Sequence, residues 1–160
     1  DDPVVYMEHK NLWALEGEVD NNDPLPLGRR RLLREGDDIT IVSWSATVHE
    51  AMAAAETLAG EGASVEVIDL RTLWPWDKER VFDSVKKTGR LIVAHESVQA
   101  GGFGAEIAAT VSDVLFRDLK APVKRIGAPR VPIAYAPPLE DMVRVTAPMI
   151  ADCARGLMKE

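Results

Sequence analysis

The stretch that decides the fold runs from residue 90 to residue 117 and reads RLIVAHESVQAGGFGAEIAATVSDVLFR. It opens with an apolar run at 91–94, which is too short for a helix and is β-branched at its centre. Polar residues and a glycine-rich segment follow, and then Phe103, Ile107, Val111 and Val114 recur at helical spacing. This order predicts a strand, a glycine loop and a helix. Polar side chains then lie at the carboxyl end of the strand, where open α/β sheets usually build their sites.

The rest of the chain repeats this alternation. Strands are expected at 39–44, 65–70 and 122–126, each followed along the chain by a helical pattern. The alternation predicts an α/β fold, a three-layer α/β/α sandwich with a mostly parallel sheet of about five strands. Residues 30–33 are expected to form an edge strand that could run antiparallel.

Capping residues place the helix ends. Thr47 and Glu50 have the spacing of a capping box and predict a helix start. Asp77 is expected to cap the next helix, and Gly89 suits its C-terminal end. The last helix is expected to begin near 146–148, with Pro148 in its first turn. Its inner face is expected to carry Ile150, Cys153 and Leu157.

Charge and composition exclude several classes of protein. The net charge is −7 and the largest basic cluster is at 29–31, which predicts no nucleic-acid partner and no anionic membrane partner. Cys153 is the only cysteine, so an intrachain disulfide and a cysteine metal cluster are impossible. No His, Asp or Glu spacing is typical of a metal site. No apolar run reaches the roughly 20 residues that a membrane span needs. A cytoplasmic location is expected.

Composition also predicts a domain boundary near the start of the chain. Residues 4–8 are expected to be the last strand of a preceding domain, because nothing before them can pair with them. Residues 16–28 are rich in Asp, Asn, Pro and Gly, which favours an extended connector. The predicted organisation is a remnant of the preceding domain at 1–13, a linker at 14–28 and the α/β domain at 29–160.

The glycines of the deciding stretch have two interpretations. Gly101, Gly102 and Gly104 could present backbone N–H groups to an anion at the start of a helix. They match neither the G-x-G-x-x-G fingerprint nor a P-loop. Close packing of the loop against the sheet is the favoured interpretation.

The polar residues at the strand end are candidates of a second kind. His95 and Glu96 are adjacent, so their side chains are expected on opposite faces of the strand and need not act together. His95 could act as a general base, but an interface or structural role is favoured for both His95 and Glu96. Trp74 and Trp76 flank a proline, and both are interface candidates: one ring could belong to the core, but two aromatic rings on one loop suggest a surface that a partner covers.

Several motifs in this order resemble one known family. VIDLRTLWPWD at 67–77, LIVAHE at 91–96 and GGFGAEIA at 101–108 are similar to the C-terminal region of the β subunit of 2-oxo acid dehydrogenase E1 components. DPVVYMEHKNL at 2–12 and PLPLG at 24–28 resemble the same family. The resemblance is strongest to pyruvate and acetoin types, on account of His9, Lys10 and the GGFG run. The sequence does not decide between these types and the branched-chain type.

The resemblance implies a transketolase C-terminal-like domain that follows a pyrimidine-binding domain. It implies an oxidoreductase with an α2β2 assembly of E1 α and β subunits, and thiamine diphosphate with magnesium in the intact enzyme. The reaction would decarboxylate the substrate and pass the acyl group to lipoyl-E2, whose subunit-binding domain docks on E1. The cofactor would be held outside this chain, so the chain alone is expected to bind no cofactor and to be inactive.

The resemblance also places two residues on the substrate side. His9 and Lys10 follow the strand that approaches the active site in the wider family, so both are substrate-side candidates. The competing interpretation makes His9 a boundary residue that pairs across domains. The sequence also allows a different class of protein, namely a stand-alone flavodoxin-like module that binds a nucleotide or anion at 101–104.

Overall fold

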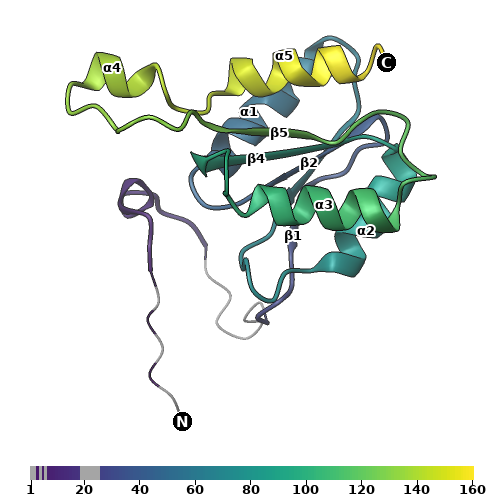
Figure 1. The fold of residues 1–160 in the computed structure, drawn as a ribbon, viewed down its shortest axis with the longest axis horizontal. Coiled ribbons are helices and arrows are strands. Elements are labelled where there is room, and N and C mark those ends of the chain that lie inside the picture. Colours follow the sequence, from purple (N-terminus) through teal and green to yellow (C-terminus); the bar gives the residue numbers. More distant parts are fainter. Residues whose placement is uncertain (1–2, 4, 6, 19–25) are drawn as a thin grey trace.

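The structure is a computed structural model that describes residues 3, 5, 7–18 and 26–160. A five-stranded sheet lies between helices on both faces (Figure 1). The strands are β1 (Arg31–Arg34), β2 (Ile39–Ser43), β3 (Val65–Asp69), β4 (Leu91–Val98) and β5 (Lys124–Ala128). The helices are η1 (Lys10–Leu12), α1 (Thr47–Gly60), α2 (Lys78–Thr88), α3 (Gly104–Val114), α4 (Pro137–Asp141) and α5 (Ala147–Leu157).

The sheet has the order β1-β3-β2-β4-β5. Neighbours among β2 to β5 are parallel, while β1 runs antiparallel to β3 at one edge. The predicted α/β sandwich with a mostly parallel, five-stranded sheet is therefore confirmed, including its antiparallel edge strand. None of the described helices has the length and apolar character that crossing a membrane requires.

Two apolar clusters fill the spaces on the two sides of the sheet. Alternate residues of the strands point to opposite faces, so Ile41 and Ile92 pack with α1 and α5, whereas Val42 and Val93 pack with α2 and α3. Both clusters consist of side chains that are almost completely withdrawn from solvent. Burial of apolar surface on both faces is the main force that holds the three layers together.

The strand order places a topological switch point between β2 and β4. From β2 the chain passes through α1 to β3 on one side, and then crosses through α2 to β4 on the other side. The connections therefore diverge at the carboxyl ends of β2 and β4. In open α/β sheets this divergence opens a crevice where ligands bind.

The helix ends confirm one predicted cap and correct another. The Asp77 carboxylate accepts a hydrogen bond from the Arg80 N–H, and Gly89 has a left-handed backbone at the other end of α2, as expected. Thr47 does not form the predicted capping box, because α1 begins after Ala46 and has no side-chain cap. Glu50 instead accepts a hydrogen bond from the Ala147 N–H at 2.7 Å, at the start of α5.

Other expected features differ in detail. The helical face over 103–114 was expected to include Val114, but this side chain is exposed and Leu115 packs in its place. The strand expected over 4–8 is wrong for Val5, Met7 and Glu8, which are not in a strand. Residues 4 and 6, and residues 19–25 of the expected linker, lie outside the described part of the chain. The short helix α4 was not expected, because residues 128–138 contain four prolines, which argue against regular helix there.

Polar side chains are also buried between β2, β3 and α2. Thr40 shares hydrogen bonds of 2.7 Å with Ser84 and 2.9 Å with Thr88, which ties α2 to β2. Glu66 is buried and pairs with Lys87. Burial alone would raise the pKa of Glu66, but the bonds from Lys87, Ser84 and the backbone outweigh burial and lower it.

Candidate functional site

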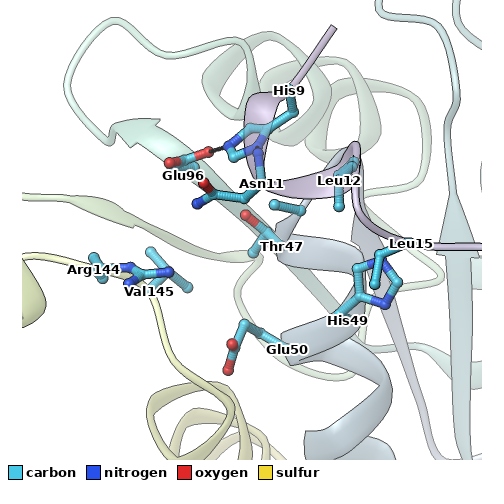
Figure 2. A pocket seen from close by; sticks show the side chains of 11 residues that line it. His9, Asn11, Leu12, Leu15, Thr47, His49, Glu50, Glu96, Arg144 and Val145 are labelled. Carbon is cyan, nitrogen blue, oxygen red and sulfur yellow. Dashed lines mark hydrogen bonds and ion pairs between the residues drawn. The ribbon is translucent and has the colours of Figure 1, made fainter.

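A cleft of about 180 Å³ opens at the switch point between β2 and β4 (Figure 2). The start of α1 forms one wall, and the segment around η1 forms another. The end of β4 contributes Glu96, and the loop before α5 contributes Arg144 and Val145. The other lining residues are His9, Asn11, Leu12, Leu15, Ala46, Thr47, His49 and Glu50. Segments far apart in the sequence therefore build one polar cleft at the edge where sites are expected.

His9 closes the top of this cleft through two hydrogen bonds. The Asn11 backbone N–H donates to His9 Nδ1 at 3.2 Å, so the proton of a neutral ring lies on Nε2. Nε2 lies 2.6 Å from Glu96 Oε2 and donates to it. Both ring nitrogens are therefore engaged. This arrangement supports the interpretation of His9 as a boundary residue, because a substrate would have to displace one of its partners.

Lys10 lies beside His9 but outside the cleft. It is the first residue of η1, its side chain is exposed, and it is absent from the cleft lining. The structure therefore separates the two substrate-side candidates, since His9 faces the cleft and Lys10 does not.

Five further polar residues of the cleft were not predicted as site residues from the sequence. Thr47 and Glu50 were assigned to a helix cap, and the other three are Asn11, His49 and Arg144. Arg144 donates to Asp141 at 3.3 Å, and Figure 2 shows its guanidinium pointing toward the cleft. No short-range pattern connects residue 47 with residue 144. Only the sheet topology, which sends both segments to the same edge, could have suggested the contact.

His95 is fully buried on the opposite side of β4 from Glu96, as the alternation of the strand predicts. Its ring stacks on Trp44 with centroids 5.1 Å apart. Nδ1 lies 3.0 Å from the carbonyl oxygen of Ser97 and 2.9 Å from its hydroxyl oxygen, whereas Nε2 has no partner among the described residues. Burial lowers the pKa of His95 and the charge of Arg125 lowers it further, while the bond to Ser97 opposes both.

Glycines enclose the ring of His95. A Cβ atom on Gly104 would lie 2.6 Å from Nε2, and one on Gly127 would lie 2.8 Å from Cε1. A Cβ atom on Gly102 would collide with the same ring at 2.7 Å. Gly101 has a left-handed backbone and open space around it. The loop at 101–104 is therefore shaped by close contact with His95, which supports packing over anion binding for Gly102 and Gly104.

The two tryptophans of the loop before α2 have different environments. Trp76 is only 4% exposed and packs edge-on against Phe82, so its ring belongs to the core and offers no surface to a partner. Trp74 is 74% exposed, and the Lys78 ammonium lies 5.7 Å from the centre of its ring. Trp74 is thus the accessible member of the pair of interface candidates.

A second exposed apolar surface lies between β5 and α5. Figure 1 shows α4 and its flanking loops projecting away from the sheet. This segment, 131–142, carries large side chains that are mostly exposed, with Tyr135 wholly exposed and Ile133 80% exposed. The others are Val131, Leu139 and Met142. So many exposed apolar groups on one projecting segment are typical of a surface that meets another protein.

The described residues do not assemble a metal site. Within 3, 5, 7–18 and 26–160, no three His, Cys, Asp or Glu side chains gather closely enough to hold an ion. In the cleft, Glu96 contacts His9 and Glu50 contacts the backbone of α5, each through one carboxylate oxygen.

Comparison with known proteins places the chain in a family. Residues 28–150 match the family described as transketolase, C-terminal domain. The chain is 42% identical over 159 residues to the β subunit of acetoin:2,6-dichlorophenolindophenol oxidoreductase of Cupriavidus necator, covering 99% of this chain and 47% of that protein. It is 39% identical over 160 residues to the 2-oxoisovalerate dehydrogenase subunit β of Bacillus subtilis, covering 98% of this chain and 49% of that protein.

A third relative has another substrate in its name. The chain is 39% identical over 160 residues to the mitochondrial pyruvate dehydrogenase E1 component subunit β of Dictyostelium discoideum, covering 97% of this chain and 45% of that protein. The chain therefore spans about half the length of these relatives.

A solved structure agrees with the sequence comparison. The structure described as a split gene transketolase, inactive β4 tetramer, superposes with a TM-score of 0.78 at 26% identity, covering 91% of this chain and 47% of that one. The sheet order, the family match and the relatives lead to one assignment. The chain belongs to the transketolase C-terminal domain family, and it resembles the β subunits of acetoin, branched-chain and pyruvate dehydrogenases.

Proposed function

We propose that the chain is the C-terminal assembly domain of the β subunit of a thiamine-diphosphate-dependent 2-oxo acid dehydrogenase E1, of the pyruvate or acetoin type. The observation that carries this proposal is similarity over nearly the whole chain to the β subunits of an acetoin oxidoreductase, a 2-oxoisovalerate dehydrogenase and a pyruvate dehydrogenase E1 component. A branched-chain E1 β subunit is the alternative, and the identity of 39% to the 2-oxoisovalerate enzyme keeps it open. The enzyme would work in the cytoplasm.

The proposed domain arrangement assigns chemistry and assembly to different parts of the protein. Thiamine diphosphate would supply the electron sink for decarboxylation in the intact enzyme. The cofactor and its magnesium ion would be held outside this chain, and this domain would contribute structure and contacts instead. The organisation proposed is a remnant of the preceding domain at 1–13, a linker at 14–28 and the assembly domain at 29–160. The chain alone is expected to be inactive.

The projecting segment 131–142 supports the assembly role. Its exposed apolar side chains are costly to leave in water, and an E1 α subunit or a second β subunit would bury them. Trp74 offers a smaller surface of the same kind. The proposed assembly is α2β2, and the subunit-binding domain of E2 is its further partner.

A chimera tests the proposal directly. The matching part of the Bacillus subtilis β subunit would be replaced by this chain, and the chimera would be produced together with its α subunit. The expected result is an α2β2 particle by mass photometry that oxidises 2-oxo acids with dichlorophenolindophenol as electron acceptor. The proposed assembly role would be contradicted if a β subunit that lacks the matching part altogether assembled and oxidised 2-oxo acids equally well.

Two matched variants of the chimera locate the contact. Ile133→Asp places a charge on the projecting segment, while Phe116→Asp places one at a similarly exposed position just after α3. The proposal expects Ile133→Asp to shift the particles toward free subunits and Phe116→Asp to leave them assembled. Equal effects of both variants would contradict the assignment of the contact to 131–142.

A further inference from the structure

The cleft at the switch point contains hydrogen-bond donors and hydrogen-bond acceptors that have no partner within the described part of the protein. One of these groups is the Thr47 hydroxyl, whose residue is only 4% exposed and for which no hydrogen bond is found within the described part of the chain. Figure 2 shows this oxygen pointing across the cleft toward Asn11. The hydroxyl is therefore available to a bound ligand.

Arg144 and the first turn of α1 add further hydrogen-bond donors to the cleft. Arg144 has five N–H donors and bonds only Asp141 within the described protein, so most of them are free. The first turn of α1 also lines the cleft, and this helix of 14 residues has no side-chain cap. Its uncapped N-terminus adds partial positive charge. Together these groups suit the carboxylate of a ligand.

The cleft also contains hydrogen-bond acceptors. Glu96 uses Oε2 for His9, and Glu50 uses Oε2 for the Ala147 N–H, so each carboxylate keeps Oε1 free. Besides its two histidines, the lining holds two carboxylates and one guanidinium. A ligand with both a positive group and a carboxylate would find a partner of opposite charge for each.

Size and apolar lining limit the rest of the ligand. A volume of about 180 Å³ holds only a small molecule. Leu12, Leu15 and Val145 provide an aliphatic portion of the wall. We propose that the cleft binds a small zwitterionic α-amino acid with a short aliphatic side chain. Its carboxylate would contact Arg144 and Thr47, and its ammonium group would contact the free oxygens of Glu50 and Glu96.

The proposal does not depend on the enzymatic role of the chain, and it can be tested on the 160-residue chain by NMR titration. Valine is the probe, isobutyrate lacks its ammonium group, and isobutylamine lacks its carboxylate. The expected result is saturable shifts for valine at the amides of residues 47 and 144, with a dissociation constant of about 1 mM or below, corresponding to a weak but specific site. Both analogues are expected to bind at least tenfold more weakly.

A matched pair of arginine variants tests the location. Arg144→Gln removes the proposed carboxylate partner, and Arg80→Gln removes an arginine that is similarly exposed and similarly paired, to an Asp three residues away. Valine should bind at least tenfold more weakly to Arg144→Gln and unchanged to Arg80→Gln. Absence of saturable shifts in the parent chain, equal binding of isobutyrate, or equal loss in both variants would each overturn the proposal.

Discussion

His9 Nε2 donates a hydrogen bond to Glu96 Oε2 at 2.6 Å, across 87 residues of sequence. This contact joins the segment before the linker to the end of β4, and it sets one wall of the cleft. Because neither partner lies in the core, the contact can be removed without opening the apolar clusters. It therefore offers a way to test how the N-terminal segment is held.

Glu96→Ala should release the segment at 7–15 while leaving the domain folded. Both partners are partly in water, so the pair contributes no more than about 1 kcal/mol to the free energy of unfolding. Hydrogen exchange should therefore speed up at the amides of residues 11–13, while the unfolding midpoint stays almost constant. Glu106→Ala, at another exposed carboxylate, is the control and should leave this exchange unchanged. Unaltered exchange in Glu96→Ala would show that other contacts hold the segment.

Gly104→Ala should destabilise the domain strongly. The added Cβ would meet the His95 ring at 2.6 Å and Val93 at 3.2 Å, and the buried ring has little room to move. Overpacking of this kind costs about 1–3 kcal/mol in the free energy of unfolding, which urea denaturation measures. Gly156→Ala in α5 is the control, because nothing lies near its added Cβ. Its gain in helix propensity should stabilise the chain by up to about 1 kcal/mol.

His95 should make the stability depend on pH on the acidic side of neutrality. Its pKa is lowered in the folded state, mainly by burial, whereas the unfolded chain takes up a proton near the ordinary value of about 6.5. Below that pH the unfolded state binds more protons, so the free energy of unfolding falls as pH decreases toward the folded-state pKa. His95→Asn keeps a donor toward Ser97 but does not titrate.

Urea denaturation at several pH values compares these chains. The slope of stability between about pH 5 and 6.5 should flatten in His95→Asn and persist in His49→Gln, whose histidine is exposed. The slope is the readout rather than the stability itself, since His95→Asn also removes the stacking on Trp44. An unchanged slope in His95→Asn would assign the acid sensitivity to other groups.

Trp76→Ala and Trp74→Ala should differ widely in their effect on the free energy of unfolding, although the two residues are only two positions apart. Trp76 belongs to the cluster around α2, so truncation should cost about 3–5 kcal/mol in the free energy of unfolding. Trp74 lies on the surface, and its truncation should change the stability by less than about 0.5 kcal/mol. Guanidinium denaturation followed by circular dichroism compares the two. Similar losses would mean that the exposed ring supports the loop.

The periodic parts of the fold could be predicted from the sequence. The β-branched runs indicated β2, β3 and β4, and Asp77 and Gly89 marked both ends of α2. The errors occurred where tertiary contacts replaced local ones. Thr47 and Glu50 have capping-box spacing, but Glu50 bonds α5 instead of its own helix start, a partner 97 residues away. Local spacing cannot report such a contact.

The candidate site was only partly predictable. The strand end at His95 and Glu96 was identified, and strand alternation correctly separated the two side chains. The pairing of Glu96 with His9 and the place of Arg144 in the cleft depend on how three distant segments converge. The role of the glycines also required the structure, because their sequence pattern fits an anion loop as well as a cage around a histidine.

The division of the core by the sheet has a consequence for how mutations combine. One cluster lies under α1 and α5 and the other under α2 and α3, with the backbone of the sheet between them. Changes in different clusters share few contacts, so their costs should add, whereas changes within one cluster should interact. Substitutions can therefore change one cluster while the other cluster continues to hold the strands that both share.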